Sequence, residues 1–149
     1  MLLFAAHDPG AKNHIGPIYR HALDLGHEAR FVDLSSPGGI LDDERSYNQV
    51  STIQPQMLVC GLSSNGSEWP LVRACRRLGV PAAMFIDIGV GNELDHVAPT
   101  GFPDRFLVTS QECVEELLEL EVRSDRVAMT GSTHFEFLST HLPEMDCNA

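Results

Sequence analysis

The chain is poor in positive charge. Of its 149 residues, 10 are Lys or Arg and 21 are Asp or Glu, which gives a formal net charge of −11. This balance argues against a nucleic-acid-binding surface and against electrostatic attachment to anionic lipid. It leaves room for a small anionic ligand, because a few backbone N–H groups can hold a phosphate without net positive charge. We therefore expect a small-molecule ligand, no nucleic acid and no membrane contact.

A long hydrophobic run is also missing. Residues 1–6 are apolar, but no basic residue precedes them, and the run stops at His7-Asp8-Pro9-Gly10. It is too short for a signal peptide or a membrane span. The sequence therefore predicts a cytoplasmic protein.

Paired cysteines and clusters of metal ligands are absent as well. The sequence holds seven histidines, but it has no His-x-x-x-His pair, no Cys/His cluster and no Cys-x-x-Cys pair. We therefore expect neither a metal site nor a cofactor. The four cysteines are interpreted as free thiols in a reducing compartment; they are Cys60, Cys75, Cys113 and Cys147.

Short apolar runs alternate with helical patterns along the chain. Strands are predicted at 2–6, 29–34, 56–60, 80–86, 105–109 and 126–130. Helices are predicted at 11–25 (with Pro17 in its first turns), 40–53, 68–78 and 111–120, a final turn or helix at 134–139, and a long loop at 89–103. The strands do not alternate in polarity, as expected when helices cover both faces. The pattern predicts a Rossmann-like, doubly wound parallel sheet of about six strands, a three-layer α/β/α fold.

One edge of this sheet is predicted to carry the function. The length favours one domain, which we place at 1–140, with a tail at 141–149. Ligands of such sheets bind outside the carboxyl ends of the strands. The segments that follow the strands are rich in Gly, Ser, Asn, Asp and His, whereas the opposite loops are short. This asymmetry predicts a site at the carboxyl edge.

Several well-known phosphate sites are excluded by the residues at this edge. Residues 7–12 contain a single glycine, so the Gly-x-Gly-x-x-Gly fingerprint is absent after the first strand. A Walker-type loop and a hydroxyl-rich flavin phosphate loop are absent there too. A phosphoacceptor receiver needs Asp at the end of its third strand, where this chain has Gly61.

The chain has His14-Ile15-Gly16-Pro17 at its first predicted helix and Gly26-His27-Glu28 before its second predicted strand. Together with further short motifs in order, these segments resemble the opening half of GT-B glycosyltransferases. These enzymes commonly begin with a strand, a His-x-x-Pro at the first helix and a Gly-His-Glu-Val before the second strand. The corresponding segments here, in order, are 14–17, 26–28, 55–59, 74–81, 103–108 and 125–132. The segment 7–10 and the Ser-rich loop 61–67 resemble the polysaccharide-biosynthesis and CDP-glycerol glycerophosphotransferase branch. The non-hydrolysing UDP-N-acetylglucosamine 2-epimerases share this fold.

The resemblance covers nearly the whole chain but only the N-terminal, acceptor-side half of such an enzyme. It implies that a second domain or a separate subunit is needed to bind the nucleotide-sugar donor. Two alternatives stay open. One is a stand-alone, non-catalytic module that binds a small sugar or phosphorylated ligand, and the other is a small enzyme acting as a homodimer.

The candidate catalytic residues are His14, Asp8 and Asp87. The resemblance implies that His14 acts as a general base on an acceptor hydroxyl, since imidazole titrates near neutral pH; the alternative is an exposed histidine of the first helical turn. In the resembling enzymes an Asp ending the third strand often orients this base, and Glu68 or Asp87 are the substitutes available here. Asp8 is expected either to accept a hydrogen bond from a substrate hydroxyl or to cap the first helix.

The candidate ligand-binding residues follow the first, third and sixth strands. Gly10 permits close backbone approach at a helix N-terminus, and a Ser/Asn-rich loop can cradle a phosphate or a sugar. Ser67 is expected to cap the helix that follows, and the turn at 131–134 either faces a cleft or caps the last helix. The full set is His7, Gly10, Ser63, Ser64, Asn65, Glu68, Gly131, Ser132 and His134.

Overall fold

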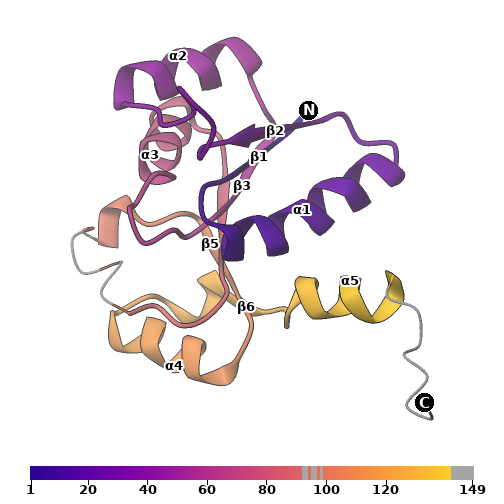
Figure 1. Cartoon of the computed structure of the whole chain (residues 1–149). Coiled ribbons are helices and arrows are strands. Elements are labelled where there is room, and N and C mark those ends of the chain that lie inside the picture. Colours follow the sequence, from indigo (N-terminus) through magenta and orange to yellow (C-terminus); the bar gives the residue numbers. More distant parts are fainter. Residues whose placement is uncertain (92–93, 95–96, 98, 142–149) are drawn as a thin grey trace.

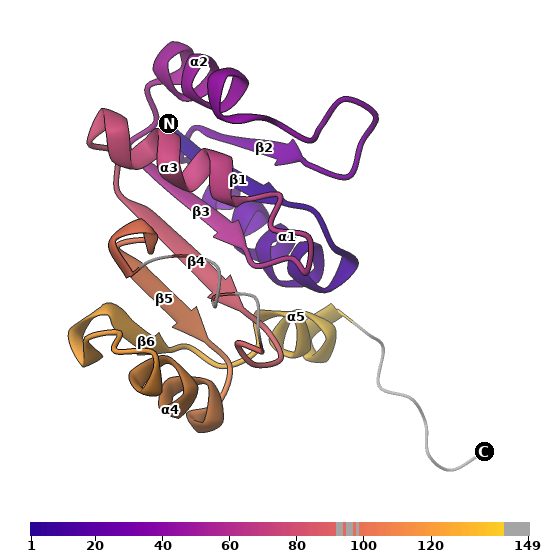
Figure 2. The same ribbon diagram turned by 90° about the vertical axis from the view of Figure 1, so that its left-hand side faces the viewer.

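A parallel sheet with one reversal in its strand order organises the chain. The computed structural model describes residues 1–91, 94, 97 and 99–141. Within these residues six parallel strands form one sheet in the order β2-β1-β3-β4-β5-β6 (Figure 2). They are β1 (Leu2–Ala6), β2 (Ala29–Asp33), β3 (Met57–Gly61), β4 (Ala82–Ile86), β5 (Arg105–Val108) and β6 (Val127–Met129). The predicted fold class is confirmed.

Helices cover both faces of this sheet (Figure 1). One face carries α1 (Pro9–Asp24) and α5 (Thr133–His141). The other carries α2 (Asp43–Ile53), α3 (Trp69–Leu78) and α4 (Gln111–Glu119). Two short 3-10 turns, η1 (Pro99–Gly101) and η2 (Ser124–Arg126), precede β5 and β6.

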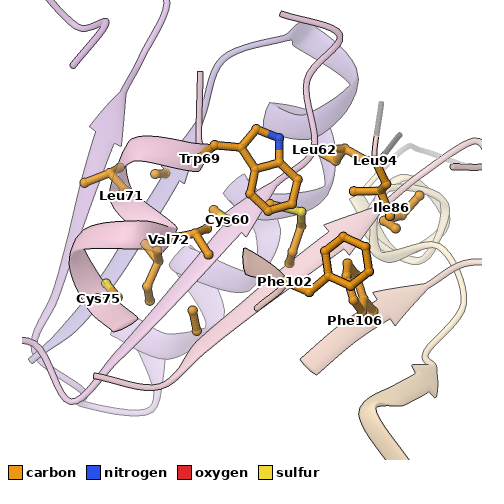
Figure 3. Close-up of a cluster of buried hydrophobic side chains, with 14 of the residues drawn as sticks. Cys60, Leu62, Trp69, Leu71, Val72, Cys75, Ile86, Leu94, Phe102 and Phe106 are labelled. Carbon is orange, nitrogen blue, oxygen red and sulfur yellow. The ribbon is translucent and has the colours of Figure 1, made fainter. Parts of the chain in front are cut away.

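The buried strands explain why their sequences do not alternate in polarity. Every residue of β4 is buried, because apolar clusters fill the space under the helices on both of its faces. Figure 3 shows the larger cluster, in which the Trp69 indole packs among side chains of the sheet and α3. The rings of Phe102 and Phe106 meet edge to face there, with centroids 5.6 Å apart.

The reversal in strand order lies between β1 and β3. From β1 the chain crosses α1 to β2 on one side, and it then crosses α2 to β3 on the other side of β1. The two strands therefore end side by side while their connections leave in opposite directions. A crevice at such a switch point is the usual ligand site of open α/β sheets.

Two helix starts differ from the predictions, for local reasons. Helix α1 begins at Pro9, so Pro17 lies inside the helix rather than in its first turns, where it cannot donate to the carbonyl of Asn13. Helix α2 begins at Asp43 rather than at 40, because the Asp42 carboxylate accepts a hydrogen bond from the Arg45 N–H and caps it.

Parts of two predicted segments lie outside the described residues. These are residues 92–93, 95–96 and 98 of the predicted loop 89–103, and residues 142–149 of the predicted tail, which include Cys147. The loop also contains η1, and α5 continues to His141. The other three cysteines are buried free thiols.

The start of α1 packs unusually close to the end of β3. A methyl group built on Gly61 would overlap the Ala11 methyl group, far inside the van der Waals contact distance of two carbons. Glycine is therefore required where the helix crosses the end of the strand, and this contact sets the height of the α1 N-terminus above the sheet edge.

We expect Gly61→Ala to destabilise the protein by about 1–3 kcal/mol, because the extra methyl group forces α1 away from the sheet. The matched control is Gly16→Ala inside α1, where the added methyl group meets nothing within 4 Å apart from its chain neighbours and the adjacent backbone of its own helix. That change should stabilise the protein by about 0.5–1 kcal/mol, the usual gain for Gly→Ala in a helix. Urea unfolding of both variants measures the two effects, and equal effects of the same sign would contradict the packing argument.

Candidate functional site

An open cavity of about 580 Å³ lies at the carboxyl edge of the sheet, beside the switch point. Four of the predicted site residues line it, and they come from three separate loops: Asp8 and Gly10 at the start of α1, Ser64 after β3, and Asp87 after β4. The remaining lining residues are Ala11, Leu62, Ile88, Gly89, Val90, Gly91 and Glu116.

A second cavity, of about 600 Å³, opens at the opposite edge, where β4 and β5 begin. Its polar side chains serve the local packing: the Arg126 guanidinium donates to the carbonyls of Phe102, Pro103 and Asp104. Ligands of open α/β sheets bind at the carboxyl ends of the strands rather than at this edge. We therefore place the candidate site at the cavity beside the switch point.

Glu68 joins the two loops of the switch point. Its side chain is fully buried, with an exposed fraction of 0%. Oε1 accepts the His7 N–H (3.1 Å), and Oε2 accepts the Ser63 N–H (3.3 Å) and the Ser63 hydroxyl. Burial raises the pKa of Glu68, while these hydrogen bonds oppose the rise. The carboxylate thus lies behind the cavity and ties the loop after β1 to the loop after β3.

The His7 ring is held between Asn65 and Asp8. The hydrogen-bond pattern places the ring proton on Nδ1, which donates to Asp8 Oδ1 (2.6 Å), while Nε2 accepts from the Asn65 amide (3.2 Å). Asn65 is itself fixed, since its Oδ1 accepts from the N–H and hydroxyl of Ser67. Three of the predicted residues therefore form one connected network.

Asp8 is the member of this network that reaches the cavity. Its Oδ2 accepts the N–H (3.0 Å) and the hydroxyl (3.2 Å) of Ser64. Burial raises the pKa of Asp8, but the hydrogen bonds from His7 and Ser64 outweigh it and hold the pKa below its ordinary 3.8. The cavity therefore contains a firmly ionised and oriented carboxylate.

Asp87 sits over the N-terminus of α1. A Cβ built on Gly10 would lie 2.5 Å from Asp87 Oδ2, so only glycine allows this approach. The Asp87 carbonyl accepts the Thr109 hydroxyl (2.8 Å), which ties the residue to the end of β5. A carboxylate is favoured here by the partial positive charge of the helix end. Because Asp87 holds this place, a bound phosphate would meet a like charge.

Glu116 is a cavity residue that sequence reasoning missed. It lies on α4, and its Oε2 accepts the Val90 N–H (2.6 Å), which anchors the loop after β4. Gly89 precedes that N–H with φ of +110°. A Glu on an amphipathic helix normally faces solvent, so its own sequence position gave no sign of this role. The only sequence signal was the glycine-rich loop that Glu116 anchors.

His14 is buried rather than exposed. It lies in the second turn of α1, has an exposed fraction of 7%, and stacks on Phe85 with ring centroids 4.7 Å apart. Its Nδ1 accepts the His134 N–H (3.4 Å) and lies 3.2 Å from the Thr133 hydroxyl. Burial lowers the pKa of His14, the nearby Asp87 carboxylate partly opposes this, and His134 adds to it. The alternative interpretation, an exposed histidine of the first helical turn, is wrong.

The turn after β6 brings its predicted residues to His14 and to the start of α5. The ring of His134 meets the His14 ring with centroids 6.0 Å apart. Ser132 caps the helix, because its hydroxyl accepts the Phe135 N–H (3.2 Å), and Gly131 supplies the left-handed φ of +74° before it. This group lies on the α1 side of the sheet and does not line the cavity.

The expected cap at Ser67 is wrong, and so is the capping alternative for Asp8. Asp8 occupies the N-cap position of α1, but among the described residues its carboxylate bonds to His7 and Ser64 rather than to the helix. The N-cap of α3 is Glu68, and the Ser67 hydroxyl donates to Asn65 instead of capping. In both cases contacts between loops that are distant in sequence replace the local cap.

Metal ligands and membrane spans were also sought in the structure. Across the described ranges, no group of three His, Cys, Asp or Glu side chains is arranged to hold a metal ion. Within the same residues no helix combines the length and the apolar character needed to cross a membrane.

The burial of His14 predicts a pH dependence of stability. Its pKa is below 6.5 in the folded protein, so the unfolded chain binds more protons once the pH falls through 6.5. The free energy of unfolding should therefore fall as the pH decreases from neutral, and less steeply in His14→Gln. Urea unfolding at several pH values measures this, with His27→Gln, an exposed histidine, as the control. Identical slopes for the wild type and His14→Gln would contradict the prediction.

Comparisons with known proteins place the fold. No family model and no curated protein matches the chain. A solved UDP-GlcNAc 2-epimerase from Neisseria meningitidis, bound to UDP-GlcNAc, matches 93% of this chain with a TM-score of 0.65 and 12% identity. A proposed UDP-N-acetylglucosamine 2-epimerase from Listeria monocytogenes matches 94% with a TM-score of 0.67 and 10% identity.

The match extends over only part of those two proteins. It covers 48% and 47% of their chains, so this chain spans about half the length of the structures it matches. The sequence motifs led us to expect the fold that the UDP-N-acetylglucosamine 2-epimerases share. The similarity to these two structures confirms that expectation about the fold. The chain has the α/β fold that makes up about half of the length of each of these two structures.

Proposed function

We propose that this chain is the sugar- or acceptor-binding half of a nucleotide-sugar enzyme, and that a second domain or subunit binds the nucleotide. The observation that carries this proposal is the cavity beside the switch point, with the carboxylates of Asp8 and Asp87 in its wall. The fold supports it, because two solved structures assigned to nucleotide-sugar epimerases contain the same fold in about half their length.

The charge of the cavity favours a sugar over a phosphate. None of the described lining residues is Lys or Arg, and Asp8, Asp87 and Glu116 are acidic. Ionised carboxylates accept hydrogen bonds from hydroxyl groups, and such bonds are stronger than those between neutral groups. A diphosphate would be repelled by the same groups. In this proposal the sugar ring enters the cavity and the diphosphate is held by the other half.

Asp87 is proposed as the group that exchanges a proton with the sugar. It lines the cavity, whereas His14 lies behind it and has an exposed fraction of only 7%. Asp87 would accept a hydrogen bond from a sugar hydroxyl group and is placed to take up its proton. The base role that the resemblance implies for His14 requires direct contact with substrate, and its burial instead favours a supporting role next to Asp87.

We expect the labelled chain to bind N-acetylglucosamine and UDP-GlcNAc in this cavity, but not UDP alone. In a ¹H–¹⁵N NMR titration the amides of Ser64 and Gly89 should shift with the two sugar ligands. Asp8→Asn and Asp87→Asn should each weaken binding about tenfold or more, the effect of losing a hydrogen bond to a charged group. Asp125→Asn is the matched control, because Asp125 pairs with Arg123 on the surface before β6.

Several outcomes would count against the proposal. Equal chemical-shift changes with UDP alone would mean that the nucleotide binds to this half. An unchanged affinity of Asp87→Asn for N-acetylglucosamine would mean that the sugar does not bind in this cavity. Turnover of UDP-GlcNAc by the chain without a partner would instead support the homodimeric enzyme. Sugar binding with no turnover in the presence of any partner would support the non-catalytic module.

A further inference from the structure

Glu68 is a fully buried carboxyl group at the switch point, and it has no role in the proposed chemistry. It does not line the cavity, and within the described part of the chain no Lys or Arg pairs with it. A buried carboxylate without a cation is costly unless hydrogen bonds satisfy it. A structural explanation must therefore come from the groups that it binds.

Those groups require an acceptor oxygen at both ends of the carboxyl group rather than any polar side chain. One oxygen accepts the His7 N–H, and the other accepts the N–H and the hydroxyl of Ser63. Both backbone donors are fixed by the chain. A glutamine in this place would turn an NH₂ group toward one of them, so one backbone N–H would lose its acceptor.

The residues that Glu68 holds are next in sequence to the two that form the Asp8 contact. His7 precedes Asp8, and its ring donates to the Asp8 carboxylate. Ser63 precedes Ser64, whose N–H and hydroxyl donate to the other oxygen of Asp8. Through its two oxygens, Glu68 therefore fixes both loops whose side chains orient Asp8.

We propose that Glu68 is a positioning residue: it clamps the loop after β1 to the loop after β3, so that Asp8 faces the cavity in the orientation that binds the ligand. This inference rests on the proposed function, because it is the contact of Asp8 with a sugar that the clamp serves.

The test is the ionisation of Asp8 in Glu68→Gln, followed by ¹³C NMR of the side-chain carboxyl groups. Loss of the clamp should loosen the hydrogen bonds from His7 and Ser64, so the pKa of Asp8 should rise toward 3.8. If Glu68 acted only as a nearby negative charge, its removal would move the pKa of Asp8 downward. A fall or an unchanged value would therefore overturn the proposal.

Ligand binding supplies the second readout. Glu68→Gln should weaken the binding of N-acetylglucosamine about tenfold, as Asp8→Asn does. The double variant should bind no more weakly than Asp8→Asn alone, because the clamp acts through Asp8. Additive losses would overturn the proposal.

Controls separate positioning from loss of fold. Glu119→Gln, at the exposed end of α4, removes a carboxylate without touching the loops and should leave both readouts unchanged. If Glu68→Gln does not fold, Ser63→Ala removes one donor to the clamp and should raise the pKa of Asp8 by a smaller amount. The Asp8 titration needs no ligand, so failure of the wild type to bind sugar would reject the proposed function and leave the positioning test intact.

Discussion

The close approach of the α1 N-terminus to the carboxyl ends of β3 and β4 determines the geometry of the candidate site. Gly61 lets the Ala11 methyl group rest directly on the end of β3, and Gly10 lets the Asp87 carboxylate lie against the first turn of the helix. Because neither glycine has a side chain that would keep the helix and the strands apart, three loops meet within one cavity. A looser contact would separate Asp8 from Ser64 and Asp87 from the helix end that stabilises its charge.

The electrostatics of this edge are the physical basis of the proposed function, in which this chain binds the sugar and a second domain or subunit binds the nucleotide. Helix N-termini are frequent phosphate sites, but here the partial positive charge of α1 is already used by the protein's own carboxylate. Asp8 is satisfied in a different way, by donors from His7 and Ser64. The edge is therefore suited to hydroxyl groups, and the anionic part of a nucleotide sugar would need cations supplied from elsewhere.

The fold could be predicted from the sequence because it depends on short-range patterns. Apolar runs, the helix-ending Gly79 and the cap at Ser110 report on neighbouring residues, and all three behave as their types suggest. For the candidate site, the sequence indicated the loops and four of the residues that line the cavity, but not how their side chains meet. Three features of the site depend on segments far apart in the chain. Asp8 bonds to Ser64 instead of capping α1, the Glu68 side chain is buried against His7, and Phe85 and α5 cover His14. No local pattern records those encounters.

The span of the Glu68 clamp has a kinetic consequence. Its contact with His7 joins residues 61 positions apart, and the Asp8–Ser64 contact joins residues 56 positions apart. Closing such long loops costs chain entropy before any contact can offset that cost, which slows their formation. The parallel pairing of β1 with β3 is slow for the same reason. The binding loops should consequently take shape late in folding, after both crossovers are complete. A partly folded chain would then have helices and strands but no formed ligand-binding site. A ligand bound in the cavity would therefore indicate that folding is complete.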